Sequence, residues 1–310
     1  MRKSTRVLHR IAVVVAVSAC LSAAQAVAQA PASAQQTKHP LTTADVLAAS
    51  TPADWRQIDP QSTIYMELPA GRVIIELAPQ FAPHYVANVE TLARQGYFNG
   101  LWVERVQDNY VAQWGDPDAK KSVGNAQRSV AAEFERPARG LSFMPLAEPD
   151  TYAPEVGFSD GFPTARDPKF GRAWLVHCYG MVGVGRDVNP DTGTGAELYA
   201  VIGQPPRQLD RNIAVVGRVL SGMPLFAAMP RGQGDLGFYA NPAQRIPIKS
   251  VRLAADLPPD QRPRFQVLKT YSPTFHAWIH VKANRQDDFF LRPASGLDVC
   301  NALPPVRRAP

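Results

Sequence analysis

Residues 101–115 of the chain, LWVERVQDNYVAQWG, hold the pattern that decides its fold. Two runs rich in β-branched and aromatic residues, 101–106 and 110–114, flank the turn-forming triplet Gln107-Asp108-Asn109. Such runs on either side of a polar triplet are typical of two antiparallel strands joined by a tight turn. The stretch therefore predicts a β-hairpin.

The residues on one face of this hairpin indicate a binding surface. If Arg105 lies opposite Val111 and Val103 opposite Gln113, these four side chains share a face, and Glu104 points to the other face. The shared face then offers a cation and an amide over an apolar floor. Such a set can bind and polarise an amide, but it contains no nucleophile, metal ligand or acid–base pair that would cleave one.

The residues before this hairpin predict a second hairpin and a helix. The strand-like runs 64–68 and 72–77 flank Pro69-Ala70-Gly71, a turn that ends in glycine. Pro83 stands in the first turn of an amphipathic helix, which we expect to cover one side of the sheet. Its apolar residues recur at helical spacing: Val86, Val89, Leu92, Ala93 and Tyr97.

Strand patterns resume later in the chain, at 174–184, 197–202, 213–219 and 246–253, with one further short helix at 221–229. Long helices are disfavoured because the chain has 29 prolines in 310 residues, and an interior proline removes a hydrogen bond and clashes with the preceding turn. Short strands with only two modest helices favour a closed, mainly β barrel.

The remaining segments are expected to surround a barrel domain that spans 63–255. Residues 31–62 are rich in Ala, Gln, Thr and Pro and are typical of a linker, with a short helix in TTADVLAAS capped by Thr43. Residues 136–173 are dense in Pro, Gly and Asp and predict a long irregular insertion. Residues 256–310 contain eight prolines and predict a C-terminal extension, either a loosely packed annex or a small extra hairpin.

The N-terminus predicts export. Residues 1–30 combine a basic start, an apolar run and small-residue cleavage sites, the pattern of a secretory signal peptide, and the run is too short to span a membrane. Within it, Val17-Ser18-Ala19-Cys20 resembles a lipobox, so acylation of Cys20 is an alternative to simple cleavage. Removing these residues lowers the net charge from +6 to about +2, so nucleic acid is not an expected partner.

Cys178 and Cys300 remain as a pair in a chain bound for an oxidising compartment. They either form a disulfide that ties the C-terminal extension to the rest of the protein, or stay as two separate buried thiols. Neither has the His or Cys neighbours of a metal site. The motifs of serine hydrolases, metalloproteases and P-loop proteins are also missing, and the glycines of 180–185 fit close backbone packing better than a phosphate loop.

Several motifs of the chain, taken in order, resemble those of the cyclophilin-type peptidyl-prolyl isomerases. In the first half these are Gly71–Leu77, Ala82-Pro83, Asn88–Leu92, Gly96–Gly100, Glu104–Val106 and Gln113–Pro117. Looser matches in the second half are Glu133-Phe134, Gly180–Arg186, Gly195–Tyr199, Leu209-Asp210, Val216–Val219, Ser221–Met223 and Ile246–Val251. The resemblance covers roughly residues 63–255, interrupted by the insertion.

This resemblance implies an eight-stranded antiparallel barrel capped by two helices, with a substrate groove on its outer wall. Arg105 takes the place of the arginine that approaches the substrate prolyl amide, and Gln113 takes that of the groove glutamine. The other groove positions fall on Tyr110, Val111, Gly185, Arg186, Tyr199 (or Leu198, if the alignment slips by one) and Leu209. No cofactor and no metal is implied.

The chain also departs from the family pattern. Glu104 stands where the family has a histidine, Arg186 where an asparagine bonds the substrate backbone, and Gln208 where it has a tryptophan, while its pocket histidine is replaced near Ile213. These changes are expected to alter substrate preference or reduce activity, and the missing tryptophan to weaken cyclosporin binding. The insertion falls near the groove, where it forms a lid or a partner surface, or serves only as padding.

Two functional hypotheses follow. The first is a periplasmic peptidyl-prolyl cis-trans isomerase (EC 5.2.1.8), a monomer that acts on proline-containing segments of exported polypeptides. The second is a catalytically weak or inactive barrel that binds proline peptides or scaffolds an assembly in the cell envelope. A third idea, an envelope hydrolase, finds no nucleophile constellation in the sequence.

Overall fold

The structure, a computed structural model, describes residues 40–262 and 264–309; the predicted signal peptide, with Cys20, lies outside these residues. In the described part of the chain, nine strands pair into one antiparallel sheet in the order β14-β4-β5-β12-β11-β13-β3-β2-β15. Their bounds are β2 (Thr63–Leu68), β3 (Gly71–Leu77), β4 (Trp102–Val106), β5 (Val111–Gly115), β11 (Met181–Val184), β12 (Leu198–Val201), β13 (Val215–Ser221), β14 (Ile246–Pro247) and β15 (Ser250–Leu253).

The two ends of this sheet meet in one chain segment, 246–253. β14 pairs with β4, and β15 pairs with β2. Between them, the Ile248 N–H donates to the Leu101 carbonyl and the Lys249 N–H donates to the Glu67 carbonyl, each at 2.8 Å. β14 and β15 are thus two halves of one strand that closes the sheet, and the predicted eight-stranded antiparallel barrel is confirmed.

Two helices pack on the barrel, as predicted. α2 (Pro83–Arg94) begins with a proline at its first position, where no backbone donor is needed. Its buried face, which includes Tyr85 and Val89, joins the apolar core inside the barrel. α3 (Met223–Ala227) is shorter and places Phe226 on Trp114, with ring centroids 5.5 Å apart.

The insertion forms a sheet of its own, so the prediction of irregular structure for 136–173 was wrong. In the described chain five antiparallel strands run in the order β6-β10-β9-β8-β7: β6 (Arg136–Pro137), β7 (Met144–Pro145), β8 (Glu155–Ser159), β9 (Phe162–Asp167) and β10 (Arg172–Leu175). Asp160 and Gly161 join β8 to β9 with φ of 48° and 90°, the conformation of a two-residue hairpin turn. Asp-Gly is typical of such a turn, but the many prolines and glycines around it favoured the prediction of irregular structure.

The strand predicted over 174–184 is in fact two strands. β10 ends at Leu175 and belongs to the insertion sheet, whereas β11 begins at Met181 and belongs to the barrel. Residues 176–180 connect them and contain Cys178. A continuous apolar pattern therefore hid a change from one sheet to another.

The terminal segments form a third sheet, in the order β1-β16-β17: β1 (Trp55–Gln57), β16 (Phe265–Leu268) and β17 (Val306–Arg308). α1 (Thr43–Ala48) packs against α4 (Pro273–Ala283). Residues 40–62 are therefore not a linker, and residues 256–309 are neither a loose annex nor a simple hairpin. Residues 273–283 did not predict a helix because their apolar side chains surround the helix axis and leave no clear period.

The N-cap of α1 is Thr42, one residue before the predicted Thr43. The Thr42 hydroxyl accepts from the Asp45 N–H at 3.1 Å, and the Asp45 carboxylate accepts from the Thr42 N–H at 2.9 Å. This reciprocal capping box needs an acid three residues after the cap, a spacing that Thr42 has and Thr43 lacks.

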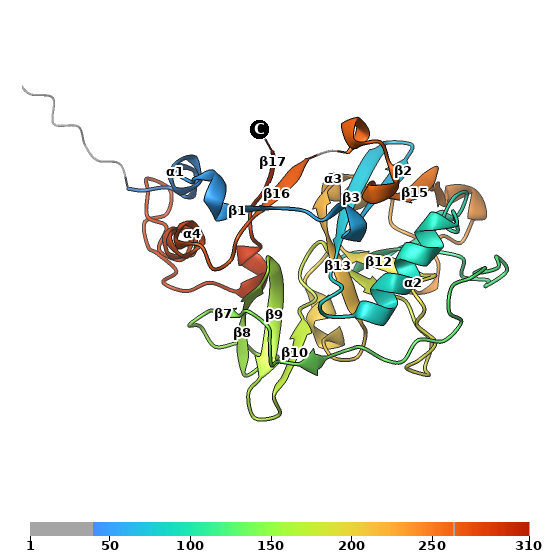
Figure 1. The fold of residues 1–310 in the computed structure, drawn as a ribbon, viewed down its shortest axis with the longest axis horizontal. Coiled ribbons are helices and arrows are strands. Elements are labelled where there is room, and N and C mark those ends of the chain that lie inside the picture. The colour runs from blue at the N-terminus through green and yellow to red at the C-terminus, as the bar shows by residue number, and fades with distance from the viewer. Residues whose placement is uncertain (1–39, 263, 310) are drawn as a thin grey trace, which may run out of the picture. The chain divides into compact units, whose positions relative to one another are not determined.

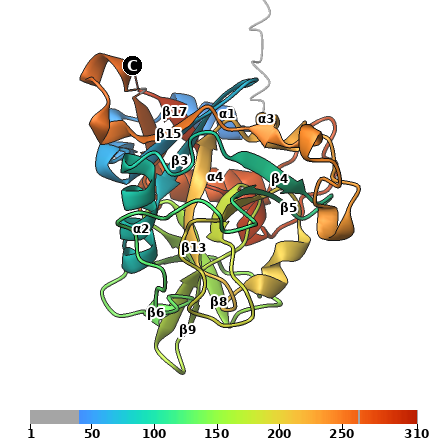
Figure 2. The same ribbon diagram turned by 90° about the vertical axis from the view of Figure 1, so that its right-hand side faces the viewer.

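Residues 40–62, 136–175 and 256–309, which we call the outer layer, share a second apolar core outside the barrel. Trp55, Phe158 and Phe275 bring it side chains from the three segments, and Phe158 meets Phe275 edge to face at 5.2 Å. Barrel residues such as Val201 join it through their outward side chains. The insertion strands lie at the bottom of both ribbon views, below the barrel strands (Figure 1, Figure 2).

A disulfide and an ionic cluster tie the outer layer to the barrel. Of the two alternatives for the cysteines, the structure has the disulfide, Cys178–Cys300, with Cα atoms 4.9 Å apart. On β3, the Glu76 carboxylate pairs with Arg56 of β1 at 2.5 Å and with Arg218 of β13 at 3.4 Å. Burial lowers the pKa of Arg218 to about 10, which leaves it cationic at neutral pH.

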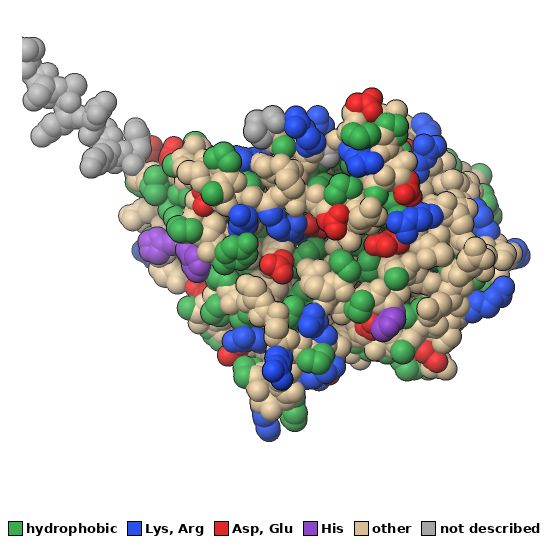
Figure 3. Space-filling view, in the orientation of Figure 1, with side chains coloured by type: hydrophobic (Ala, Val, Ile, Leu, Met, Phe, Trp, Pro, Cys, Tyr) green, Lys and Arg blue, Asp and Glu red, His purple; other side chains and the backbone are tan. Residues whose placement is uncertain are grey.

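On the face shown in Figure 3, basic side chains are spread widely, with acidic ones between them. Among the described residues, no helix combines the length and apolar character that a membrane span requires.

Candidate active-site groove

A groove of about 810 Å³ lies over the outer face of β4, β5 and β12. Gln113 and Tyr199 point into it, because their neighbours Trp114 and Leu198 face the barrel core. The structure brings all eight predicted site residues to this one groove: Arg105, Tyr110, Val111, Gln113, Gly185, Arg186, Tyr199 and Leu209.

The pairing of β4 with β5 differs from the predicted one. Arg105 lies opposite Gln113, and Val103 lies opposite Trp114, with Glu104 as the extra residue of a β-bulge. Val103 therefore faces the barrel core and does not share the groove face. The bulge is what sets Arg105 directly opposite Gln113, because the register of Val103 and Trp114, continued without it, would pair Arg105 with Ala112.

The Arg105 guanidinium is held from three sides. It donates to the Gln113 side-chain carbonyl at 3.0 Å, to the Leu236 carbonyl at 2.6 Å, and to the Gln107 side chain. Its cation also lies 5.6 Å from the ring centre of Tyr110 and 5.5 Å from that of Phe238. Burial lowers the pKa of Arg105, but a guanidinium starts so high that it stays charged.

Glu197, which was not predicted from the sequence, extends the line of hydrogen bonds that runs from Arg105 to Gln113. Gln113 donates its amide to the Glu197 carboxylate at 2.6 Å while its carbonyl accepts from Arg105, so both ends of the amide are fixed. Burial raises the pKa of Glu197, and Asp187 and Asp116 raise it further. A signal was present, since Glu197 stands two residues before Tyr199 in the motif already noted.

Glu104 sits beneath the groove in a neutral form. Its side chain is 1% exposed, and within the described residues its two carboxyl oxygens have no hydrogen-bond partner. Burial raises the pKa of Glu104 to about 9, and the nearby Glu197 adds to the shift. The residue in the histidine position therefore adds no negative charge next to Arg105 at pH 7.

Tyr199 forms one apolar wall of the groove. Its ring lies over the backbone of β11, where a Cβ on Gly183 would come within 2.3 Å of it, so a glycine is needed there for close packing. Leu209 on the 3₁₀ helix η3 (Pro205–Leu209) adds a second wall. Phe238 comes from a distant segment and adds a third, for which the sequence carried no signal.

Arg186 is held by backbone carbonyls of its own loop and of the segment that contains Asn212. Its guanidinium donates to the carbonyls of Asn212 at 3.0 Å and Asp187 at 2.6 Å, and lies over the Phe134 ring. The neighbouring Gly185 packs closely over Glu197. A Cβ added to Gly185 would lie 3.0 Å from the Cβ of Glu197. The rim of the groove is thus set by backbone contacts of a charged residue.

This arrangement suits binding of a neutral amide in an extended chain. A fixed cation faces an apolar pocket, and a side-chain amide lies beside it to meet a peptide backbone. Within the described residues, no group of three or more His, Cys, Asp or Glu side chains is placed to hold a metal ion.

Known proteins share this fold and region. The family model described as "Cyclophilin type peptidyl-prolyl cis-trans isomerase/CLD" matches residues 63–253. The chain is 29% identical over 189 residues to a "Probable peptidyl-prolyl cis-trans isomerase" of Brucella suis biovar 1 (strain 1330), which covers 61% of this chain and 82% of that protein.

A solved structure extends the likeness beyond the barrel. The chain resembles the crystal structure of the cyclophilin AquaCyp293 from Hirschia baltica with a TM-score of 0.65 and 26% identity, over 87% of this chain and 99% of that one. Because the barrel segment is a smaller share of the chain than this, the likeness includes parts of the outer layer.

Proposed function

The chain belongs to the cyclophilin-type peptidyl-prolyl cis-trans isomerase family, and from that premise we propose that it accelerates rotation about X-Pro bonds in exported proteins, with Arg105 stabilising the twisted amide. The observation that carries this proposal is the Arg105 guanidinium, held against Gln113 in a groove that Tyr199 and Leu209 also line.

The physical chemistry of the reaction supports this role. Rotation about an X-Pro bond breaks amide resonance and meets a barrier of about 20 kcal/mol. As the amide twists, the prolyl nitrogen becomes pyramidal and its lone pair becomes free to accept a hydrogen bond. A cationic donor aimed at that nitrogen stabilises the twisted state more than either planar state.

Arg105 has the donors for this task. Of its five N–H groups, three donate to Gln107, Gln113 and Leu236 in the described structure, which leaves two for a substrate. One charge-assisted bond supplies about 1.5–3 kcal/mol. The rest must come from a pocket, walled by Tyr199 and Leu209, that holds the proline ring while the other half of the bond turns.

A protease-coupled assay on a proline tetrapeptide tests the proposal. Arg105→Ala should lower kcat/KM by about 10- to 150-fold, the loss of one such bond. Arg72→Ala, which removes an arginine on β3 that pairs with Glu67, is the matched control and should leave the rate unchanged. A wild-type protein that binds the peptide without catalysis would support the binding-module hypothesis instead.

We also propose that the protein is exported to the periplasm, where it acts as a monomer. The basic, apolar and small-residue order of 1–30 supports export, and so does a disulfide, which persists in oxidising compartments. The mass of the mature N-terminus tests it. Cleavage near residue 30 is expected, whereas a chain beginning at an acylated Cys20 would place the protein on a lipid anchor.

A further inference from the structure

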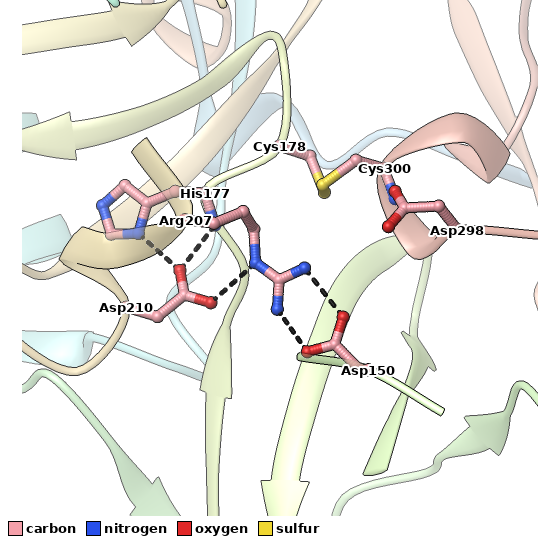
Figure 4. Close-up of a disulfide and its surroundings, with 7 residues drawn as sticks. All are labelled: Asp150, His177, Cys178, Arg207, Asp210, Asp298 and Cys300. Atoms are coloured by element: carbon pink, nitrogen blue, oxygen red, sulfur yellow. Dashed lines mark hydrogen bonds and ion pairs between the residues drawn. A yellow bond between two sulfur atoms is a disulfide. The ribbon is translucent and has the colours of Figure 1, made fainter. Parts of the chain in front are cut away.

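A chain of buried polar side chains links Asp150 of the insertion to His177 (Figure 4), which contacts Tyr199 of the groove. The Asp150 carboxylate accepts two parallel hydrogen bonds from Arg207, at 2.9 and 2.7 Å. Arg207 also donates through Nε to Asp210 at 3.0 Å. Asp210 in turn accepts from the backbone N–H of His177 at 2.9 Å and lies 2.8 Å from its Nδ1.

The last link of this chain is a wall of the groove. Nε2 of His177 lies 2.9 Å from the Tyr199 hydroxyl, and the two rings stack with an interplanar angle of 11°. In the tautomer that carries its proton on Nδ1, His177 donates to the Asp210 carboxylate, and Nε2 accepts a hydrogen bond from the Tyr199 hydroxyl. Burial raises the pKa of Tyr199 well above its usual value, so the hydroxyl keeps the proton it donates.

Each link comes from a different part of the fold. Asp150 lies between β7 and β8 of the insertion, Arg207 and Asp210 lie on and after η3, and His177 lies between β10 and β11, next to Cys178 of the disulfide. The four side chains are between 0% and 7% exposed. Water therefore has little access to these bonds, and removing one link leaves a buried polar group with fewer partners.

The same chain also holds a second groove wall. Leu209 lies on η3 between Arg207 and Asp210, so the pairs made by these two residues fix the position of the helix that carries it. Asp150 itself is not among the groove residues. A contact with the insertion thus reaches both Tyr199 and Leu209 without touching a substrate.

We propose that Asp150, Arg207, Asp210 and His177 are positioning residues through which the insertion sets the apolar pocket of the groove. The insertion is then neither a lid nor padding, but a brace behind the walls formed by Tyr199 and Leu209. The proposal rests on the proposed function in that the groove binds proline peptides. Loosening the brace lowers affinity for the peptide, since a pocket that is no longer fixed must be ordered on binding.

The test compares two carboxylates of the insertion. Asp150→Asn breaks the brace, whereas Glu155→Gln breaks the Arg166–Glu155 pair, which is more exposed and is not part of the brace. Calorimetry with a proline tetrapeptide should show a Kd about 2- to 30-fold weaker for Asp150→Asn, the range of long-range coupling, and an unchanged Kd for Glu155→Gln. KM should rise in parallel, with a smaller change in kcat.

Tyr199→Phe, which removes one hydroxyl, completes a double-mutant cycle. If the brace acts through Tyr199, the affinity of the double variant Asp150→Asn/Tyr199→Phe should fall by a smaller factor than the product of the factors for the two single variants. Hydrogen exchange should also quicken at residues 198–201 and 205–209 in Asp150→Asn but not in Glu155→Gln. Wild-type affinity in a folded Asp150→Asn, or fully independent effects, would overturn the proposal. A wild-type protein that binds without isomerising defeats the proposed activity and leaves this comparison of affinities intact.

Discussion

The barrel and the outer layer obtain their cores from the chain in different ways. Hairpins such as β2–β3 and β4–β5 pair strands that are neighbours in sequence, and their alternating side chains fill one interior. The outer layer instead joins β1 to β16 and places Phe158 on Phe275, across more than a hundred residues in each case. The difference teaches that local pattern suffices for part of this protein, while the rest depends on links between distant segments.

Removing the disulfide is expected to have the largest effect, and to lower the stability of the outer layer more than that of the barrel. Cys178 and Cys300 are 122 residues apart, and a loop of that length corresponds to about 4–5 kcal/mol in the chain-entropy view of cross-links. The Cys178→Ser/Cys300→Ser protein should unfold at lower urea, with faster hydrogen exchange in the outer layer than in the barrel. Reductant should reproduce this in the wild type, and equal exchange changes in both regions would contradict it.

Glu76 tests the junction between the two regions. Glu76→Gln leaves Arg56 and Arg218 without their carboxylate in a buried place, which should cost about 3 kcal/mol of unfolding free energy. Urea titration measures this loss. Arg218→Met added to the Glu76→Gln variant should recover part of the stability by removing one unpaired charge. A Glu76→Gln protein as stable as wild type would show that the junction contributes little to the unfolding free energy.

Glu104 tests the barrel alone, through pH. The pKa of Glu104 is about 9 in the folded protein, well above the ordinary glutamate value, so folding favours its protonated form. The unfolding free energy therefore falls as the pH rises between about 5 and 9. Glu104→Gln should therefore be more stable by about 2–3 kcal/mol at pH 7, and by almost nothing at pH 4.5.

Chemical denaturation at several pH values measures this gain. A Glu104→Gln gain that stays constant between pH 5 and 9 would mean that Glu104 is ionised in the folded protein.

The smallest effect is expected for an ion pair that belongs to neither core. Arg166 and Glu155 lie on the surface of the insertion sheet, with about a third of each side chain exposed. Arg166→Ala should change the unfolding free energy by less than about 1 kcal/mol, because exposed pairs gain little over hydration. A larger loss would show that the insertion sheet depends on its surface charges as well as on its apolar core.

The sequence predicted the barrel and the groove better than the outer layer, for a physical reason. The hairpin at 101–115 and the helix that begins at Pro83 bury one face each, so their periodicity is visible in a few residues. α4 is apolar around its axis, and the insertion strands carry Pro and Gly within them. Their structure is stabilised by partners that the local pattern does not contain.

Within the groove, single residues follow the same division. The motifs placed Arg105 and Gln113 together, but the regular alternation assumed for β4 put Val103 on the wrong face, because a bulge at Glu104 cannot be read from spacing alone. Phe238 and Leu236 reach Arg105 from a segment far along the chain. No pattern near either residue indicates that contact.

By itself, the sequence determined most strands of the barrel and its two helices, since these depend on residue type and short-range alternation. The resemblance of its motifs to a known family added most of the groove side chains, but not Glu197 or Phe238. The tertiary structure decided the face that each side chain takes at the bulge, the pairing of Cys178 with Cys300, and the path from Asp150 to Tyr199. The last two features join residues that are distant in sequence, and such contacts form only when the folded chain offsets the entropy of bringing them together.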